Sequence, residues 1–180
     1  MIICLGWGSL IYKPESLAIS GGWQEDGPSV SIEYLRQSKD GRLTLVIEPS
    51  APELTVLWAK MQTNDLDEAK ENLRQREGDT MIKYIGEWTK GNKSPANIPE
   101  PANWAKQIDV TATIWTALPA KFNGDNFRKP TIEEAISYLE QLKPHQKYLA
   151  EEYIRKTPQQ ISTKYRSRFE EHFGWFHITA

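Results

Sequence analysis

Apolar and polar positions along the first two thirds of the chain predict several strands. The uninterrupted apolar run Met1–Leu5 predicts a buried strand. Val30–Gln37 and Leu43–Glu48 read as strands on either side of Lys39-Asp40-Gly41, a sequence that favours the tight turn of a β-hairpin. Three later segments have the same strand-like composition: Leu54–Lys60, Met81–Trp88 and Val110–Leu118.

A helical period replaces this pattern in the middle of the chain. Three apolar residues recur at the spacing of one helix face: Leu66, Ala69 and Leu73. Charged residues occupy the other faces, as expected of a helix that lies on the protein surface. Asn64 or Asp65 can cap the start of this helix, and Gly78 suits the left-handed position just past its end.

The last third of the chain predicts three helices: Thr131–Leu142, Lys143–Lys156 and Gln159–Phe173. The first of them begins with Thr131 and Glu134 at the spacing of a capping box. Four aromatic residues gather near the chain end: Phe169, Phe173, Trp175 and Phe176. They predict a helix end that docks on the body of the protein, and an association surface is the alternative.

Strands first, one helix in the middle and helices last indicate an α+β protein rather than an alternating parallel fold. We expect a small mixed β-barrel of about six strands, with flanking helices and extra C-terminal helices. Residues 1–180 are expected to form one domain, with a β-barrel core and one helix in residues 1–120 and a helical extension in residues 121–180. The proline-containing stretch Gly91–Asn103 is interpreted as a surface loop.

Composition narrows the class of protein. The chain has 180 residues, of which 39% are hydrophobic, and a net charge of −2, so it can bury one sizeable core and lacks the basic surface of a nucleic-acid-binding protein. Its single cysteine, Cys4, excludes an internal disulfide and favours a reducing compartment. No segment has the pattern of a signal peptide or of a membrane span. We expect a cytoplasmic protein that binds neither nucleic acid nor membrane, and the oligomeric state is left open.

The first candidate site follows the opening strand, at Trp7-Gly8-Ser9-Leu10. A glycine on each side of Trp7 lets the backbone turn sharply and approach a ligand. Successive amides at such a turn point into one concavity and can bind an anion. The alternative is a turn without any ligand-binding role.

The second candidate is Glu77, in the last turn of the predicted central helix and next to Gly78. The negative end of the helix dipole disfavours a carboxylate there, so we expect the pKa of Glu77 to be raised. A raised pKa suits a group that takes and returns a proton near neutrality. The alternative is a solvated acid in a charge-rich helix.

Together these motifs resemble those of the gamma-glutamylcyclotransferase-like superfamily. That family opens with a strand that runs into Tyr-Gly-Ser-Asn or Tyr-Gly-Ser-Leu, and a later strand and helix end in a motif containing Glu-Gly. In this chain the opening reads Leu5-Gly6-Trp7-Gly8-Ser9-Leu10, the later strand reads Thr55-Val56-Leu57-Trp58-Ala59, and the helix end reads Leu73-Arg74-Gln75-Arg76-Glu77-Gly78. Trp7, Leu10 and Arg74 stand where members commonly have tyrosine, asparagine and aspartate.

The resemblance implies an enzyme that releases 5-oxoproline from a γ-glutamyl amine or peptide, without a metal, nucleotide or prosthetic group. Glu77 would be the general acid/base. Tyr84 matches a tyrosine that the family places near the substrate. The remaining substrate-binding positions would be those of the opening turn: Trp7, Gly8, Ser9 and Leu10.

Other function classes remain open at this point. A serine hydrolase built on Ser9 would need one of three histidines as its partner: His145, His172 or His177. Their spacing supports neither this partnership nor a metal site. A non-catalytic relative would use the same pocket to bind a small carboxylate or a partner peptide. In an enzyme we expect Glu77 in a cavity whose opposite wall is the Gly8–Leu10 turn, whereas solvent exposure or an ion pair with Arg74 or Arg76 favours the binding protein.

Overall fold

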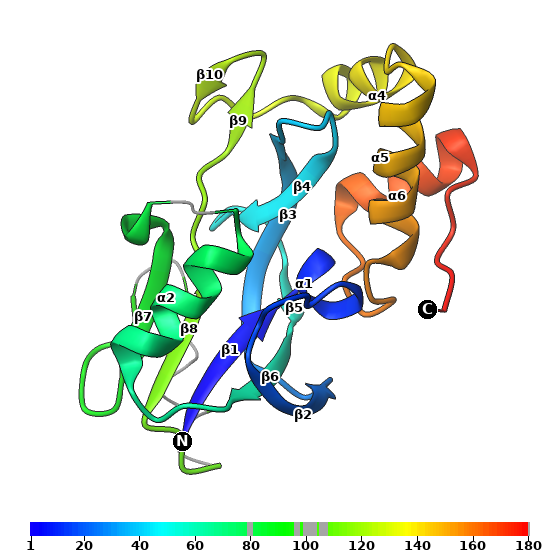
Figure 1. Ribbon diagram of the computed structural model, residues 1–180. Coiled ribbons are helices and arrows are strands. Elements are labelled where there is room, and N and C mark those ends of the chain that lie inside the picture. Colours follow the sequence, from blue (N-terminus) through cyan, green and yellow to red (C-terminus); the bar gives the residue numbers. More distant parts are fainter. Residues whose placement is uncertain (79–80, 96–97, 99–103, 105–107, 180) are drawn as a thin grey trace.

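A computed structural model describes residues 1–78, 81–95, 98, 104 and 108–179. Within these residues the chain is an α+β protein in which two five-stranded mixed sheets are flanked by five α-helices (Figure 1). Most of the predicted surface loop Gly91–Asn103 lies outside the described residues.

The first sheet is built around the opening strand. Its strands, in spatial order, are β2 (Ile19–Gln24), β6 (Leu57–Met61), β1 (Ile2–Gly6), β8 (Ala112–Thr116) and β7 (Ile85–Thr89). Strand β1 pairs antiparallel with β6 and parallel with β8. All five residues of β1 are buried, because both faces of this central strand are covered.

The two faces of β1 contribute to two different hydrophobic cores. Ile3 and Leu5 belong to the main core, whereas Ile2 and Cys4 belong to a second core beneath helix α2 (Leu66–Arg76). This division follows from the alternation of side chains along a strand. The turn that follows β1 therefore emerges between the two cores.

The second sheet is built around β3 (Ser29–Gln37), the longest strand. The other strands are β4 (Leu43–Ile47), β5 (Glu53–Thr55), β9 (Lys121–Phe122) and β10 (Asp125–Asn126). Strands β3 and β4 form the predicted hairpin, and Gly41 adopts a positive φ of 91° in its turn. A register shift between Tyr34 and Arg36 bends this hairpin.

In place of the expected small mixed β-barrel of about six strands, the described residues form two mixed sheets, and no closed barrel is detected among them. The segment expected as one strand, Leu54–Lys60, is divided at Val56: β5 pairs with β3, and β6 pairs with β1 and β2. At the break, the Val56 N–H donates to the Pro28 carbonyl oxygen at 3.1 Å. Consecutive strands thus enter different sheets at this corner, and the observed pairings leave both sheets open.

Helix α2 has the expected ends. The Asp65 carboxylate accepts from the Glu68 N–H at 3.0 Å at its start, and Gly78 has a φ of 73° after its end. Two elements near the first motif were missed: α1 (Ser9–Tyr12) and β2, which both lie in a segment rich in proline and glycine. A short 3-10 helix, Ile82–Tyr84, precedes β7 where a continuous strand was expected.

The three C-terminal helices are α4 (Ile132–Glu140), α5 (Pro144–Lys156) and α6 (Lys164–Phe173), and they gather at one side of the second sheet (Figure 1). The predicted capping box of Thr131 and Glu134 is present. These helices share the main core with β1 and β3 through Leu139, Tyr153 and Phe169. The expected helical extension also contains the short strands β9 and β10.

The aromatic residues near the chain end mostly dock on the body of the protein, as expected. Phe169 and Trp175 are buried, and Phe173 stacks on Trp175 with ring centroids 4.4 Å apart. Phe176 is exposed. Among the described residues, no helix has the length and apolar character needed to cross a membrane.

Candidate active site

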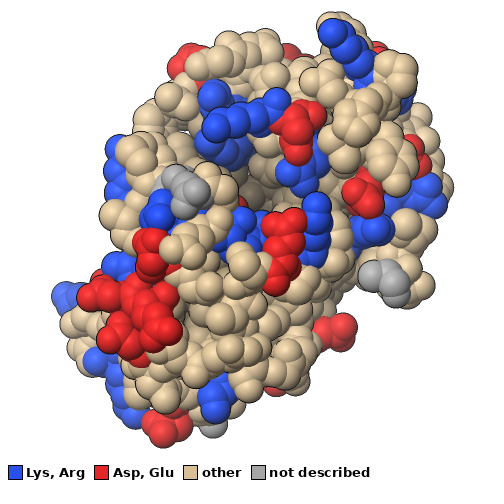
Figure 2. All heavy atoms as spheres, in the orientation of Figure 1, with Lys and Arg blue, Asp and Glu red and all other residues tan. Residues whose placement is uncertain are grey.

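One cavity of about 660 Å³ contains every residue that the sequence analysis proposed for the site. These residues are Trp7, Gly8, Ser9, Leu10, Glu77 and Tyr84. The face shown in Figure 2 is hollowed, with basic and acidic side chains around the hollow. The structure therefore brings together the end of β1, the end of α2 and the segment before β7.

Glu77 reaches the cavity because it directly follows Arg76, the last residue of α2. Its N–H still donates to the Leu73 carbonyl oxygen at 3.0 Å, and the chain then turns away at Gly78. Only 16% of the Glu77 side chain is exposed. The alternative of a solvated surface acid therefore does not describe Glu77.

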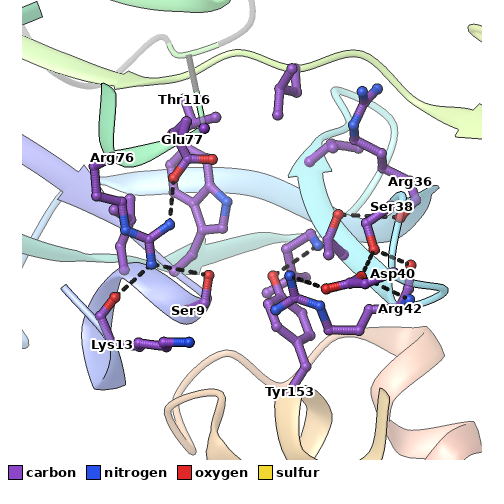
Figure 3. Close-up of a pocket in the computed structure, with 18 of the residues that line it drawn as sticks. Ser9, Lys13, Arg36, Ser38, Asp40, Arg42, Arg76, Glu77, Thr116 and Tyr153 are labelled. Carbon is purple, nitrogen blue, oxygen red and sulfur yellow. Dashed lines mark hydrogen bonds and ion pairs between the residues drawn. The ribbon is translucent and has the colours of Figure 1, made fainter. Parts of the chain in front are cut away.

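Arg76 connects Glu77 to the turn that follows β1. Its guanidinium contacts a Glu77 carboxylate oxygen at 2.9 Å, and it donates to the Lys13 carbonyl oxygen at 2.6 Å and to Ser9 Oγ at 3.4 Å (Figure 3). The Arg76 side chain is only 8% exposed. One buried guanidinium thus fixes the distance between the acid and the turn.

This arrangement corrects the expected geometry in one respect. Glu77 and Ser9 lie side by side on one wall of the cavity, bridged by Arg76, and not on opposite walls. The opposite wall comes from the β3–β4 hairpin (Figure 3). Of the two arginines that the sequence suggested as partners, Arg76 pairs with Glu77, while Arg74 binds Glu71 at 2.6 Å.

Burial raises the pKa of Glu77 above its ordinary value of 4.5, and the positive charge of Arg76 opposes this rise. The direction agrees with the expectation from the sequence, but burial, and not the helix dipole, is the largest cause. A carboxyl group in this state exchanges a proton closer to neutrality than an exposed glutamate does.

The opposing effects of burial and Arg76 lead to a first prediction. In Arg76→Gln, loss of the neighbouring positive charge should raise the pKa of Glu77 further. A titration of the Glu77 carboxyl carbon by NMR measures this change directly. Arg74→Gln is the matched control, because Arg74 pairs with Glu71 on the surface of the same helix. A pKa of Glu77 that is unchanged or lower in Arg76→Gln would contradict this account.

The turn after β1 presents backbone donors beside Glu77. Ser9 and Leu10 are the first residues of α1, and the first hydrogen bonds of this short helix come from Ile11 and Lys13. The helix itself therefore does not use the amides of Ser9 and Leu10. The Leu10 side chain is buried in the second core. The polar groups that Leu10 offers to the cavity are therefore those of its main chain.

The opposite wall carries Arg42 and Asp40, whose side chains pair at 2.8 Å. Arg42 also lies over the ring of Tyr153, with 5.4 Å between the guanidinium carbon and the ring centroid. Tyr153 comes from α5, so a C-terminal helix builds part of this wall. The Tyr153 hydroxyl accepts from the Leu45 N–H at 3.2 Å.

Basic residues outnumber acidic ones among the described residues that line the cavity. The five basic residues are Lys13, Arg36, Lys39, Arg42 and Arg76, and the three acidic ones are Glu15, Asp40 and Glu77. A concave surface with this balance attracts an anionic ligand. The composition of the chain does not predict this excess of basic residues in the cavity, because the overall net charge is −2.

Tyr84 and Trp7 occupy the cavity wall in different ways. Trp7 is buried in the main core, and it therefore forms an apolar part of the wall. Tyr84 is half-buried, and Lys83 lies over its ring at 5.1 Å. Tyr84 thus lines the cavity, as the resemblance implies, and no hydrogen bond joins the described side chains of Tyr84 and Glu77.

The serine hydrolase alternative loses support from the positions of the histidines. All three histidines lie in the described part of the chain, and none lines the cavity that contains Ser9. His172 pairs with Glu140, and His177 contacts the carbonyl oxygens of Arg155 and Thr157. Over the described ranges, no group of three or more His, Cys, Asp or Glu side chains is placed to hold a metal ion.

Sequence reasoning missed Arg42 and Tyr153 as cavity residues. Arg42 follows the predicted hairpin turn, and Tyr153 lies on a predicted helix, but neither position carries a local signal for a site. The approach of Tyr153 to Gly8, and of Arg42 to Tyr153, depends on how β3, β4 and α5 pack, which is a long-range property. Arg76 was detectable, because it adjoins Glu77 in the sequence.

Comparisons of this chain with protein-family models, with curated proteins and with solved structures gave no match. The resemblance to the cyclotransferase-like superfamily thus depends on the two motifs and on the cavity they share.

Proposed function

We propose that this protein is a gamma-glutamylcyclotransferase-like enzyme that releases 5-oxoproline from a γ-glutamyl amine or peptide. The observation that carries the proposal is the position of the Glu77 carboxylate, buried in a cavity beside the Gly8–Leu10 turn. In a γ-glutamyl group the α-amine and the α-carboxylate are bonded to the same carbon. A base for the amine and an anion site for the carboxylate must therefore be neighbours, and the side-by-side placement of Glu77 and the turn fits this requirement better than opposite walls would.

In the proposed reaction the α-carboxylate binds the amides of Ser9 and Leu10. The Glu77 carboxylate takes a proton from the α-ammonium group, and the freed nitrogen attacks the γ-carbonyl carbon of the same molecule. A ring C–N bond forms, and the bond to the leaving amine breaks as Glu77 returns its proton to the nitrogen of that amine. The ring nitrogen releases its second proton to solvent, which leaves the neutral lactam of 5-oxoproline. Ring closure within one molecule needs mainly a folded substrate conformer and proton transfer.

The electrostatics of the cavity support these roles. The raised pKa of Glu77 suits a group that is both base and acid in one turnover. The excess of basic residues around the cavity favours the substrate carboxylate. The Arg76 ion pair favours the ionised form of Glu77 and so opposes the effect of burial.

The same ion pair favours a second candidate function. A non-catalytic relative would use the cavity to bind a small carboxylate or a partner peptide, with Glu77 permanently neutralised by Arg76. Both candidates predict carboxylate binding, so binding alone does not separate them. Turnover does.

The test of the proposed function is a search for the product. Purified protein is incubated with a panel of γ-glutamyl dipeptides and γ-glutamyl amines, and 5-oxoproline is measured by mass spectrometry. The proposal expects enzyme-dependent 5-oxoproline from at least one compound, above the rate of spontaneous cyclisation. If the whole panel yields none, the enzymatic proposal is wrong and the binding function takes its place.

A further inference from the structure

Among the described residues, the C-terminal helices contribute Tyr153 to the cavity lining, and its side chain carries a polar hydroxyl group. Its ring is held from two sides, by the edge of Tyr34 with ring centroids 6.0 Å apart and by the Arg42 guanidinium. The residue is only 4% exposed. Tyr153 is thus fixed in place before any ligand binds.

The Tyr153 hydroxyl lies against Gly8, at the start of the turn. A Cβ atom added to Gly8 would be 2.3 Å from the hydroxyl oxygen, so only glycine leaves room for it. The oxygen already accepts from the Leu45 N–H, whereas its own proton has no acceptor among the described residues. Burial raises the pKa of Tyr153 well above its ordinary value, so the hydroxyl stays protonated at neutral pH and can donate.

We propose that Tyr153 donates a hydrogen bond to the ligand carboxylate that the Gly8–Leu10 turn binds. The inference rests on the proposed function, from which it takes the position of the carboxylate. The occupied acceptor side of the hydroxyl directs its proton away from Leu45. Asp40 pairs with Arg42, but the basic residues that line the described cavity still outnumber the acidic ones, which favours a negatively charged acceptor. Helix α5 thereby completes the binding site.

The experiment measures binding and does not depend on turnover. Calorimetric titrations compare 5-oxoproline, which has the carboxylate, with pyrrolidin-2-one, which has the same ring without it. Tyr153→Phe should bind 5-oxoproline about 10- to 100-fold more weakly than the wild-type protein, as expected for a lost hydrogen bond to a charged group. Binding of pyrrolidin-2-one should not change.

Tyr34→Phe is the matched control, because Tyr34 contacts Tyr153 in the core but does not line the cavity. It should bind 5-oxoproline as the wild-type protein does. A melting curve for each variant checks the fold. If Tyr153→Phe does not fold, the wild-type protein labelled with ¹³C at the tyrosine Cζ atoms provides the second measurement: 5-oxoproline should shift the Tyr153 signal and pyrrolidin-2-one should not.

The outcomes distinguish this inference from the proposed function. Wild-type affinity in Tyr153→Phe, or an unshifted Tyr153 signal at saturating 5-oxoproline, would overturn the role of Tyr153 and leave the cyclotransferase proposal in place. Tyr153-dependent binding of 5-oxoproline without any turnover of γ-glutamyl compounds would support the inference and overturn the enzymatic function. Glutarate, a second small carboxylate, is titrated in the same way. If the wild-type protein binds neither 5-oxoproline nor glutarate, there is no carboxylate site and the inference is wrong.

Discussion

Replacement of Glu77 by glutamine should lower the rate of 5-oxoproline release by about 100- to 10,000-fold, the usual contribution of a general acid/base. Glutamine keeps the size of the side chain and an acceptor oxygen for Arg76, but it neither takes a proton from the α-ammonium group nor returns one. Folding should be preserved, because Arg76 keeps its contact with the Lys13 carbonyl oxygen. Initial rates by mass spectrometry and a thermal melt measure the two effects separately.

Glu71→Gln is the control for this substitution. Glu71 lies on the same helix but pairs with Arg74 at the protein surface. Glu71→Gln removes one carboxylate and changes the net charge by the same amount as Glu77→Gln does. It should leave turnover unchanged. Near-wild-type rates in Glu77→Gln would remove Glu77 from the mechanism, whatever its position in the cavity.

A second large effect is expected from Gly8→Ala. The added Cβ would lie 2.3 Å from the Tyr153 hydroxyl oxygen and 3.0 Å from its ring carbon Cζ. Tyr153 cannot move freely, since Tyr34 and Arg42 hold its ring. We expect a stability loss of about 1–3 kcal/mol, as for other overpacked sites, together with weaker binding of 5-oxoproline because the turn is displaced. Chemical denaturation and calorimetry measure these two losses.

The cause of this loss can be isolated with a double substitution. Tyr153→Phe removes the atom closest to the new Cβ, so Gly8→Ala should cost less stability in that background than in the wild-type protein. Gly22→Ala in β2 is the control, because a Cβ at Gly22 meets no atom within 4 Å. If the stability losses of Gly8→Ala and Tyr153→Phe simply add up in the double variant, the Tyr153 hydroxyl does not exclude a side chain at position 8.

Features specified by local sequence could be predicted. The opening strand, the hairpin turn at Gly41, the Asp65 cap of α2 and the Thr131 capping box all depend on residues within a few positions of one another. The approach of Glu77 to the Gly8–Leu10 turn came from a family resemblance. Neither motif specifies that approach by itself.

Features set by long-range pairing could not be predicted. The apolar residues on both sides of Val56 read as one strand, because nothing local indicates that the partner strand changes from β3 to β1 at this position. The described strands accordingly lie in two sheets, with β5 in one and β6 in the other. Arg42 and Tyr153 were missed as site residues for a related reason, since their contact with each other, and the contact of Tyr153 with the turn, depend on the packing of α5 against the β3–β4 hairpin.

In this account, Glu77 and the carboxylate-binding turn Gly8–Leu10 form one ligand-binding site. A crystal structure of the protein with bound 5-oxoproline is the most direct test of this shared site. The account predicts that the carboxylate of 5-oxoproline contacts the amides of Ser9 and Leu10 and the hydroxyl of Tyr153, with the ring nitrogen within hydrogen-bond distance of the Glu77 carboxylate. A ligand bound in another part of the molecule, or in this cavity with its ring nitrogen turned away from Glu77, would contradict it.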